Sequence, residues 1–135
     1  MPEGGHCPNY EFALCNGAAR KQSFLLEEAP VLLIHLHRGY QKWQRGITTS
    51  HKVTRAISFP KVLDWLQSGP YDFAGAVLHI GETCSSGHYT AALKLQGNQY
   101  GVFNDNAPVG LKSWQYFETP HVQKQVYILL YTRRS

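Results

Sequence analysis

A histidine and a neighbouring amide–acid pair are the residues of this sequence best suited to acid–base chemistry. His88 follows Gly87, and Asn104-Asp105 comes sixteen residues later. A histidine that serves as a general base needs an acceptor on its second ring nitrogen, which fixes its tautomer and orientation. Asn104 or Asp105 could supply that acceptor. The alternative is purely structural, because Asn and Asp also gather in turns for local hydrogen-bonding reasons.

Two predicted strands would bring these residues together. Residues 89–95 and 99–103 each read as a short strand, and Gln96-Gly97-Asn98 between them has the composition of a hairpin turn. This turn lies near the middle of the interval from His88 to Asn104. The start of the first strand should therefore lie beside the end of the second, with the two side chains as neighbours.

Five blocks of the sequence resemble, in order, those of the ubiquitin-specific proteases, which are papain-like cysteine deubiquitinases. They are residues 30–38 (PVLLIHLHR), 57–64 (ISFPKVLD), 71–81 (YDFAGAVLHIG), the histidine box of 87–89 with 103–105, and 126–131 (VYILLY). The resemblance implies an α+β fold that is mainly antiparallel β. It would be the palm half, at the C-terminal end, of a papain-like catalytic domain, spanning residues 13–135 after a loose segment at 1–12.

The resemblance also implies roles for single residues. His88 matches the general base that activates a cysteine thiol, and Asn104 matches the third catalytic residue, which is Asp or Asn in the family. Asp105 matches an acidic neighbour that supports or replaces it in some members. Gly87 and Tyr89 match positions beside the channel for the ubiquitin tail, which makes them candidate substrate-binding residues. The implied partners are ubiquitin and ubiquitinated proteins, and no cofactor is implied.

The nucleophile is the main departure from the family pattern. The family carries it in a Gly-Asn-Thr-Cys box upstream of the histidine box, and these 135 residues contain no such box. The three cysteines, Cys7, Cys15 and Cys84, stand in other contexts. Cys84 is expected to be an ordinary loop thiol, because a reactive thiolate needs an electropositive setting. We therefore expect the N-terminal half of the catalytic domain to be missing and the isolated chain to be inactive.

Two other functions stay open at this point. The chain could be an inactive remnant that binds ubiquitin or another protein through the same palm surface. It could also be a metal hydrolase, because His35 and His37 would share one face of a strand and His79 would lie on a nearby strand. No metal site is expected, however. Cys7 and Cys15 are spaced too widely for a zinc knuckle, and both His35 and His79 match packing positions of the family.

Composition narrows the remaining possibilities. A chain of 135 residues with 43% hydrophobic and 16% charged residues is typical of one folded domain. The net charge of +4 forms no dense basic stripe, so nucleic acid is not an expected partner. The sequence contains no apolar run of about 18 residues, so no membrane span is predicted. No signal peptide is recognised at its start. Three cysteines do not suggest a disulfide framework, which favours an intracellular location, cytoplasmic or nuclear.

The other elements are expected to be mostly strands. A strand is predicted over residues 31–38, then a hairpin loop over 41–51, and a strand over 52–58. Residues 61–67 are predicted as a short helix or turn with Leu63 and Leu66 inward. Further strands are predicted over 71–80 and 125–132, and the two hairpin strands extend at most over 88–96 and 98–104. A helical turn at 113–117 is predicted to anchor Trp114 in the core. This content indicates an antiparallel sheet with few helices.

Overall fold

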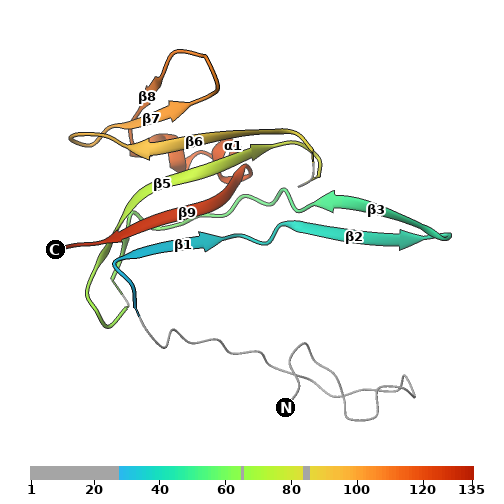
Figure 1. Ribbon diagram of the computed structural model, residues 1–135, viewed down its shortest axis with the longest axis horizontal. Coiled ribbons are helices and arrows are strands. Elements are labelled where there is room, and N and C mark those ends of the chain that lie inside the picture. Colours follow the sequence, from blue (N-terminus) through green and yellow to red (C-terminus); the bar gives the residue numbers. More distant parts are fainter. Residues whose placement is uncertain (1–27, 65, 84–85) are drawn as a thin grey trace, which may run out of the picture.

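A large antiparallel sheet dominates the computed structural model, which describes residues 28–135 except residue 65 and residues 84–85. Its strand order is β1-β9-β5-β6-β7-β8, with β4 paired to β5 (Figure 1). The strands are β1 Val31–His35, β4 Val62–Leu63, β5 Tyr71–Ile80, β6 His88–Lys94, β7 Tyr100–Phe103, β8 Gly110–Lys112 and β9 Val126–Arg133. This architecture confirms the predicted α+β class, which is mainly antiparallel β.

A two-stranded hairpin extends from one side of the large sheet (Figure 1). It consists of β2 Gly39–Gln44 and β3 Ile47–Lys52. The turn at its tip is Arg45-Gly46, and both residues have positive φ angles of 53° and 76°. Two consecutive residues with positive φ give a turn whose twist matches that of the paired strands. The sequence therefore builds a continuous hairpin here.

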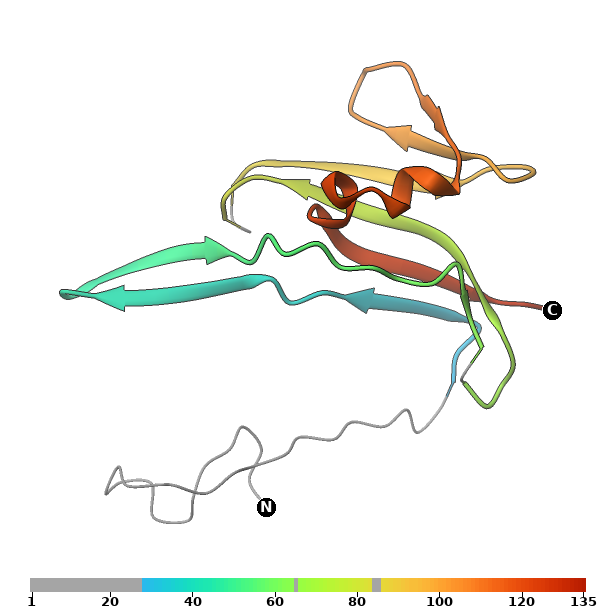
Figure 2. The same ribbon diagram turned by 180° about the vertical axis from the view of Figure 1, so that it is seen from behind.

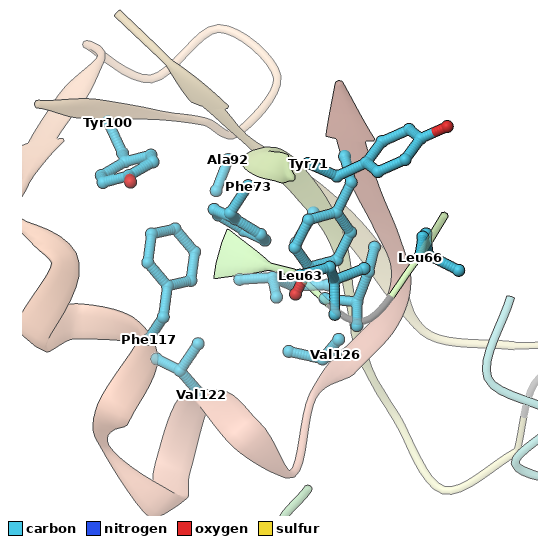
Figure 3. Close-up of a cluster of buried hydrophobic side chains, with 13 residues drawn as sticks. Leu63, Leu66, Tyr71, Phe73, Ala92, Tyr100, Phe117, Val122 and Val126 are labelled. Atoms are coloured by element: carbon cyan, nitrogen blue, oxygen red, sulfur yellow. The ribbon is translucent and has the colours of Figure 1, made fainter. Parts of the chain in front are cut away.

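The hydrophobic core lies on one face of the large sheet. Across this face run the 3-10 helix η2 Trp114–Glu118 and the short helix α1 Pro120–Gln123 (Figure 2). Figure 3 shows Phe117 and Val122 of this helical segment facing Phe73 and Tyr100 of the sheet. The ring centroid of Phe73 lies 4.9 Å from that of Phe117. Buried aromatic rings of this kind contribute a large share of the apolar area that stabilises a small domain.

The opposite face of the sheet is also apolar, but much of it is exposed. A line of registered residues crosses it from β1 to β8, because each residue pairs with the next. Its members are Leu33, Leu130, Gly75, Leu93, Gly101 and Leu111. We call this line the leucine row. Leu33 is 71% exposed and Leu111 is 59% exposed. Exposed apolar patches of this kind mark surfaces that associate with other protein.

The structure corrects two predictions, the loop over residues 41–51 and the strand over residues 52–58. Residues 41–51 form most of β2 and β3 rather than a loop, and of the predicted strand over 52–58 only Lys52, the last residue of β3, lies in a strand. The carbonyls of Val53 and Arg55 accept hydrogen bonds from the Arg38 guanidinium at 3.1 and 3.0 Å. Those carbonyls are thereby satisfied outside any strand ladder. The sequence offered no signal for this arrangement.

Other elements follow the predictions more closely. The segment predicted as a helix or turn begins with β4, yet Leu63 and Leu66 are buried as expected. η2 coincides with the predicted helical turn, and Trp114 packs against the core. β8 and α1 were not predicted. The N-terminal segment 1–12 and all three cysteines lie outside the described residues. Among the described helices, none has the length and apolar character needed to cross a membrane.

Candidate active site

His88 and Asn104 meet at one end of the β6–β7 hairpin. β6 begins at His88, and β7 ends one residue before Asn104. The register pairs Ala91 with Phe103, which aligns the two ends. His88 Nε2 lies 2.5 Å from Asn104 Oδ1. The predicted proximity of these two side chains is confirmed.

This contact assigns the ring nitrogens of His88. An amide oxygen can only accept a hydrogen bond, so Nε2 of His88 carries the proton and donates it to Asn104. In the neutral ring the lone pair then lies on Nδ1. The side chain of His88 is 43% exposed. Because Nδ1 carries the lone pair and the ring is partly exposed, Nδ1 is the atom that can remove a proton from a second group.

Asp105 lies near the same nitrogen at a longer distance. The backbone turns sharply here, since Asp105 has a φ of 48° and the Ala107 amide donates to the Asn104 carbonyl at 2.9 Å. Asp tolerates this left-handed conformation better than most residues. One Asp105 carboxylate oxygen lies 3.8 Å from His88 Nε2. This separation suits attraction to a protonated imidazole, whereas Asn104 makes the hydrogen bond.

The backbone conformation at position 87, just before His88, requires a glycine. Its φ is 115°, and a Cβ at this position would lie 2.3 Å from the carbonyl oxygen of Ile80. Such a contact is far shorter than atoms allow, so another residue would displace the chain. The glycine therefore brings the start of β6 directly against the end of β5.

Tyr89 lies on the other face of the sheet from His88, because successive strand residues point to opposite faces. Its ring centroid is 4.6 Å from that of His79 and 5.8 Å from that of Tyr127. The structure therefore brings His88, Asn104, Asp105 and Gly87 together, but not Tyr89. Tyr89 remains only a predicted substrate-binding residue.

A second histidine, His79, contacts the backbone of Ser86, just before Gly87 and His88. It is 1% exposed, and its Nε2 lies 2.8 Å from the carbonyl oxygen of Ser86. Its Nδ1 lies 3.0 Å from Lys52 Nζ. The sequence predicted a packing role for His79, but no sequence signal pointed to Lys52. Only the pairing of β5 with β6 and the fold of the β2–β3 hairpin bring these residues together.

The histidines considered as metal ligands do not gather into a site. The His35 and His37 ring centroids are 6.4 Å apart, and the His35 ring packs edge-on against Tyr127 at 4.7 Å. Within residues 28–135, leaving aside positions 65, 84 and 85, no three His, Cys, Asp or Glu side chains cluster as metal ligands. His35 therefore takes part in aromatic packing.

Sequence comparison places this geometry in a known family. The family profile described as ubiquitin carboxyl-terminal hydrolase matches residues 11–131. The chain belongs to the ubiquitin carboxyl-terminal hydrolase family. The matched range includes His88, Asn104 and Asp105. The match agrees with the family resemblance of the five sequence blocks and identifies this chain as the C-terminal part of such a hydrolase domain.

Individual relatives support the same assignment. Ubiquitin carboxyl-terminal hydrolase 3 of Homo sapiens is 32% identical over 93% of this chain and 25% of its own length. Ubiquitin carboxyl-terminal hydrolase 10 of Saccharomyces cerevisiae is 30% identical over 85% of this chain and 14% of its own length. This chain therefore spans a quarter or less of these two relatives.

Solved structures show the same fold. The chain resembles a chain of the Ubp8-Sgf11-Sgf73-Sus1 SAGA DUB module with a TM-score of 0.62 and 31% identity, covering 78% of this chain and 24% of that one. A structure of this module bound to ubiquitin aldehyde matches with a TM-score of 0.61 and 28% identity, covering 78% of this chain and 25% of that one. The likeness supports the predicted fold, which is the palm half of a papain-like hydrolase domain.

Proposed function

We propose that this chain supplies the base side of a deubiquitinase active site. In this proposal His88 and Asn104 act on a cysteine of another segment, and the reaction is hydrolysis of the isopeptide bond after the C-terminal glycine of ubiquitin. The hydrogen bond between His88 Nε2 and Asn104 Oδ1, in a chain of this family, is the observation that carries the proposal.

The geometry of His88 suggests how each step would run. Nδ1 takes the proton of the cysteine thiol, and the thiolate attacks the carbonyl carbon of the ubiquitin glycine. The tetrahedral intermediate collapses as His88 returns that proton to the departing lysine amine, which leaves an acyl-enzyme. His88 then deprotonates water, which attacks the acyl carbon and releases ubiquitin and the thiol. Asn104 holds the ring throughout, and Asp105 stabilises the imidazolium by its charge.

The cysteine itself is proposed to lie outside residues 1–135. The sequence contains no Gly-Asn-Thr-Cys box, and Cys7, Cys15 and Cys84 do not match that context. Ubiquitin and ubiquitinated proteins are the proposed partners, supported by structures of the related SAGA module bound to monoubiquitin and to ubiquitin aldehyde. The intracellular location suggested by the cysteine content remains a prediction.

The alternative is an inactive chain that binds ubiquitin or another protein. The exposed leucine row favours it, because an apolar sheet face can bind a partner without any nucleophile. Titration of isotope-labelled ubiquitin with this chain, followed by NMR, separates the alternatives when it is combined with the activity measurement below. Binding without any contribution to catalysis would support the binding module.

A chimaera tests the catalytic proposal directly. The segment of human ubiquitin carboxyl-terminal hydrolase 3 that aligns with this chain is replaced by the corresponding residues of this chain. Release of a fluorophore from a ubiquitin C-terminal amide is then measured. We expect turnover that His88→Ala removes. A chimaera that folds and binds ubiquitin but shows no turnover would contradict the proposal and favour the binding module.

A further inference from the structure

We propose that Lys52 and His79 are positioning residues for His88. In this proposal Lys52 orients His79, and His79 holds the carbonyl of Ser86, which fixes the backbone turn from which β6 begins. The consequence for catalysis rests on the proposed function, whereas the positioning itself can be measured without it. His79, a polar residue, is almost completely buried against this turn.

The two contacts of His79 require a single tautomer. Lys52 Nζ is a donor without acceptor capacity, so His79 Nδ1 accepts its hydrogen bond at 3.0 Å. The Ser86 carbonyl only accepts, so His79 Nε2 donates to it at 2.8 Å. Both bonds fit a neutral ring that carries its proton on Nε2. In the other tautomer both bonds would be lost together.

Lys52 reaches His79 from the two-stranded hairpin. It is the last residue of β3 and pairs with Gly39 at the base of the hairpin. Its Nζ also donates to the His79 carbonyl at 2.9 Å. The next residue, Val53, donates its amide to the Arg38 carbonyl at 2.8 Å. The base of the hairpin is therefore held in place, and Lys52 links it to the end of β5.

Ser86 and Gly87 pack directly against the imidazole of His79. A Cβ at Gly87 would lie 3.0 Å from His79 Nε2. The ring thus sets how close the Ser86–Gly87 backbone comes to β5. His88 is the next residue, and its ring must meet Asn104 through Nε2 while Nδ1 faces the reacting group. A displacement of about 1 Å in such an arrangement can reduce a rate about 10²-fold.

The surroundings of His79 favour a strong interaction. The ring of Tyr89 covers it at a centroid distance of 4.6 Å, and the ring of Tyr127 lies 6.2 Å away. Hydrogen bonds in an environment that excludes water are stronger than those at the surface. The aromatic rings that shield His79 from solvent therefore strengthen its hydrogen bond to the Ser86 carbonyl.

The tautomer of His79 gives the first test on the unmodified chain. Long-range 1H–15N correlation spectra of the histidine-labelled chain report which ring nitrogen carries the proton, and a His79→Gln variant identifies the His79 signals. We expect Nε2 to be protonated and Nδ1 to be bare. A His79 ring protonated on Nδ1, or exchanging rapidly between tautomers, would overturn the proposal without any further variant.

Variants test whether the pair holds the loop. Lys52→Met removes the ammonium, and Lys42→Met is the matched control in the exposed part of the same hairpin. We expect Lys52→Met to make the His79 tautomer exchange, to shift the His88 ring signals, and to raise hydrogen exchange over residues 86–90 about tenfold. Lys42→Met should change none of these. Equal behaviour of the two variants would show the proposal to be wrong.

A second pair of variants covers the case in which Lys52→Met does not fold. His79→Gln keeps an N–H donor near the Ser86 carbonyl, whereas His79→Leu removes it. We expect the glutamine to preserve most of the protection over residues 86–90 and the leucine to lose it. Equal protection in both variants would refute the role of the His79–Ser86 bond.

Turnover of the chimaera separates this inference from the proposed function. Lys52→Met in the chimaera should lower kcat about 10- to 100-fold and leave KM within about twofold, because a displaced base slows chemistry more than binding. Unchanged kcat beside a loosened loop would overturn the positioning role. An inactive parent chimaera would instead count against the proposed function, and the NMR and exchange measurements would still decide the inference.

Discussion

The imidazole of His88 and the amide of Asn104 are hydrogen-bonded although they lie sixteen positions apart along the chain. A tight hairpin makes this possible, because β6 and β7 run back along each other from a turn that includes Gly97, with a φ of 71°. The amide fixes the ring from the Nε2 side. The proposed catalysis by His88 depends on that orientation.

Removal of the Asn104 amide should reduce catalysis strongly but not completely. In the chimaera we expect Asn104→Ala to lower kcat about 10²- to 10⁴-fold, because the imidazole loses its fixed tautomer. His88→Ala should remove nearly all turnover. Asn106→Ala, in the same turn, is the control and should change kcat by less than about twofold. Full turnover in Asn104→Ala would transfer the orienting role to Asp105.

The isolated chain is expected to release little or no fluorophore from a ubiquitin C-terminal amide. It has no cysteine in the family's nucleophile context, and thiolate chemistry needs one. Cys84→Ala should therefore leave the measured rate unchanged. Robust turnover that disappears in Cys84→Ala would make Cys84 the nucleophile and overturn its assignment as an ordinary loop thiol.

The side chain of Arg38 should be essential for stability. Its guanidinium donates to four carbonyls, those of Val53, Arg55, Gln123 and Lys124, at 2.9–3.1 Å. Arg38→Met would remove all four hydrogen bonds of this buried guanidinium, so we expect a loss of about 3 kcal/mol or more in the free energy of unfolding. Urea denaturation measures it.

Arg55→Met is the matched control for that measurement. It makes the same chemical change at an exposed side chain and retains the Arg55 carbonyl as an acceptor. A loss within about 0.5 kcal/mol is expected. Equal losses in the two variants would show that the hydrogen bonds of Arg38 are not the cause.

The ion pair between Asp72 and Arg134 should make stability depend on pH. Hydrogen bonds from Arg134, at 2.6 and 3.0 Å, lower the pKa of Asp72 below its ordinary value of 3.8. A lowered pKa contributes stability above the ordinary value, and this contribution is lost as the pH falls through the folded-state pKa. Because the pair is partly exposed, we expect less than about 1 kcal/mol.

Melting curves at pH 7 and near pH 2 test this contribution. Asp72→Asn should reduce the difference in stability between the two pH values, since the titrating group is absent. Asp64→Asn removes an exposed carboxylate outside the ion pair and is the control. If Asp72→Asn and the unmodified chain lose the same stability between the two pH values, the ion pair does not contribute.

The exposed leucine row should make the isolated chain associate. We expect oligomers in gel filtration, and a larger monomer fraction in Leu33→Lys or Leu111→Lys, because a charge on an apolar face opposes association. Val53→Lys places the same charge at an exposed residue outside the row and should change the elution little. A clean monomer of the unmodified chain would contradict this expectation.

The hairpin that carries the candidate site could be predicted from the sequence because its signals are local. A glycine-containing turn between two short alternating runs fixes both the pairing and the approach of His88 to Asn104. The aromatic and aliphatic residues of β5 and β9 likewise indicate central strands. These are the parts of the fold in which neighbours along the chain determine the structure.

The parts that the sequence did not reveal depend on contacts between distant segments. The contact of Lys52 with His79 spans 27 positions, and the bonds from Arg38 to α1 and its C-cap span 85 and 86 positions. A lysine in a polar hairpin gives no sign of its partner. The strand predicted over residues 52–58 is wrong for the same reason, because its carbonyls bind the Arg38 side chain rather than another strand.

The position of β9 in the sheet has a consequence for synthesis on the ribosome. β9 lies between β1 and β5, so the strand made last in this sequence separates two strands made much earlier. Until it emerges, β1 and β5 each expose an unpaired edge and the leucine row is divided. Newly made chains should therefore depend on chaperones for longer than a fold of local hairpins would, and a stop codon shortly before residue 126 should leave β1 unpaired and separate from strands β4 to β8.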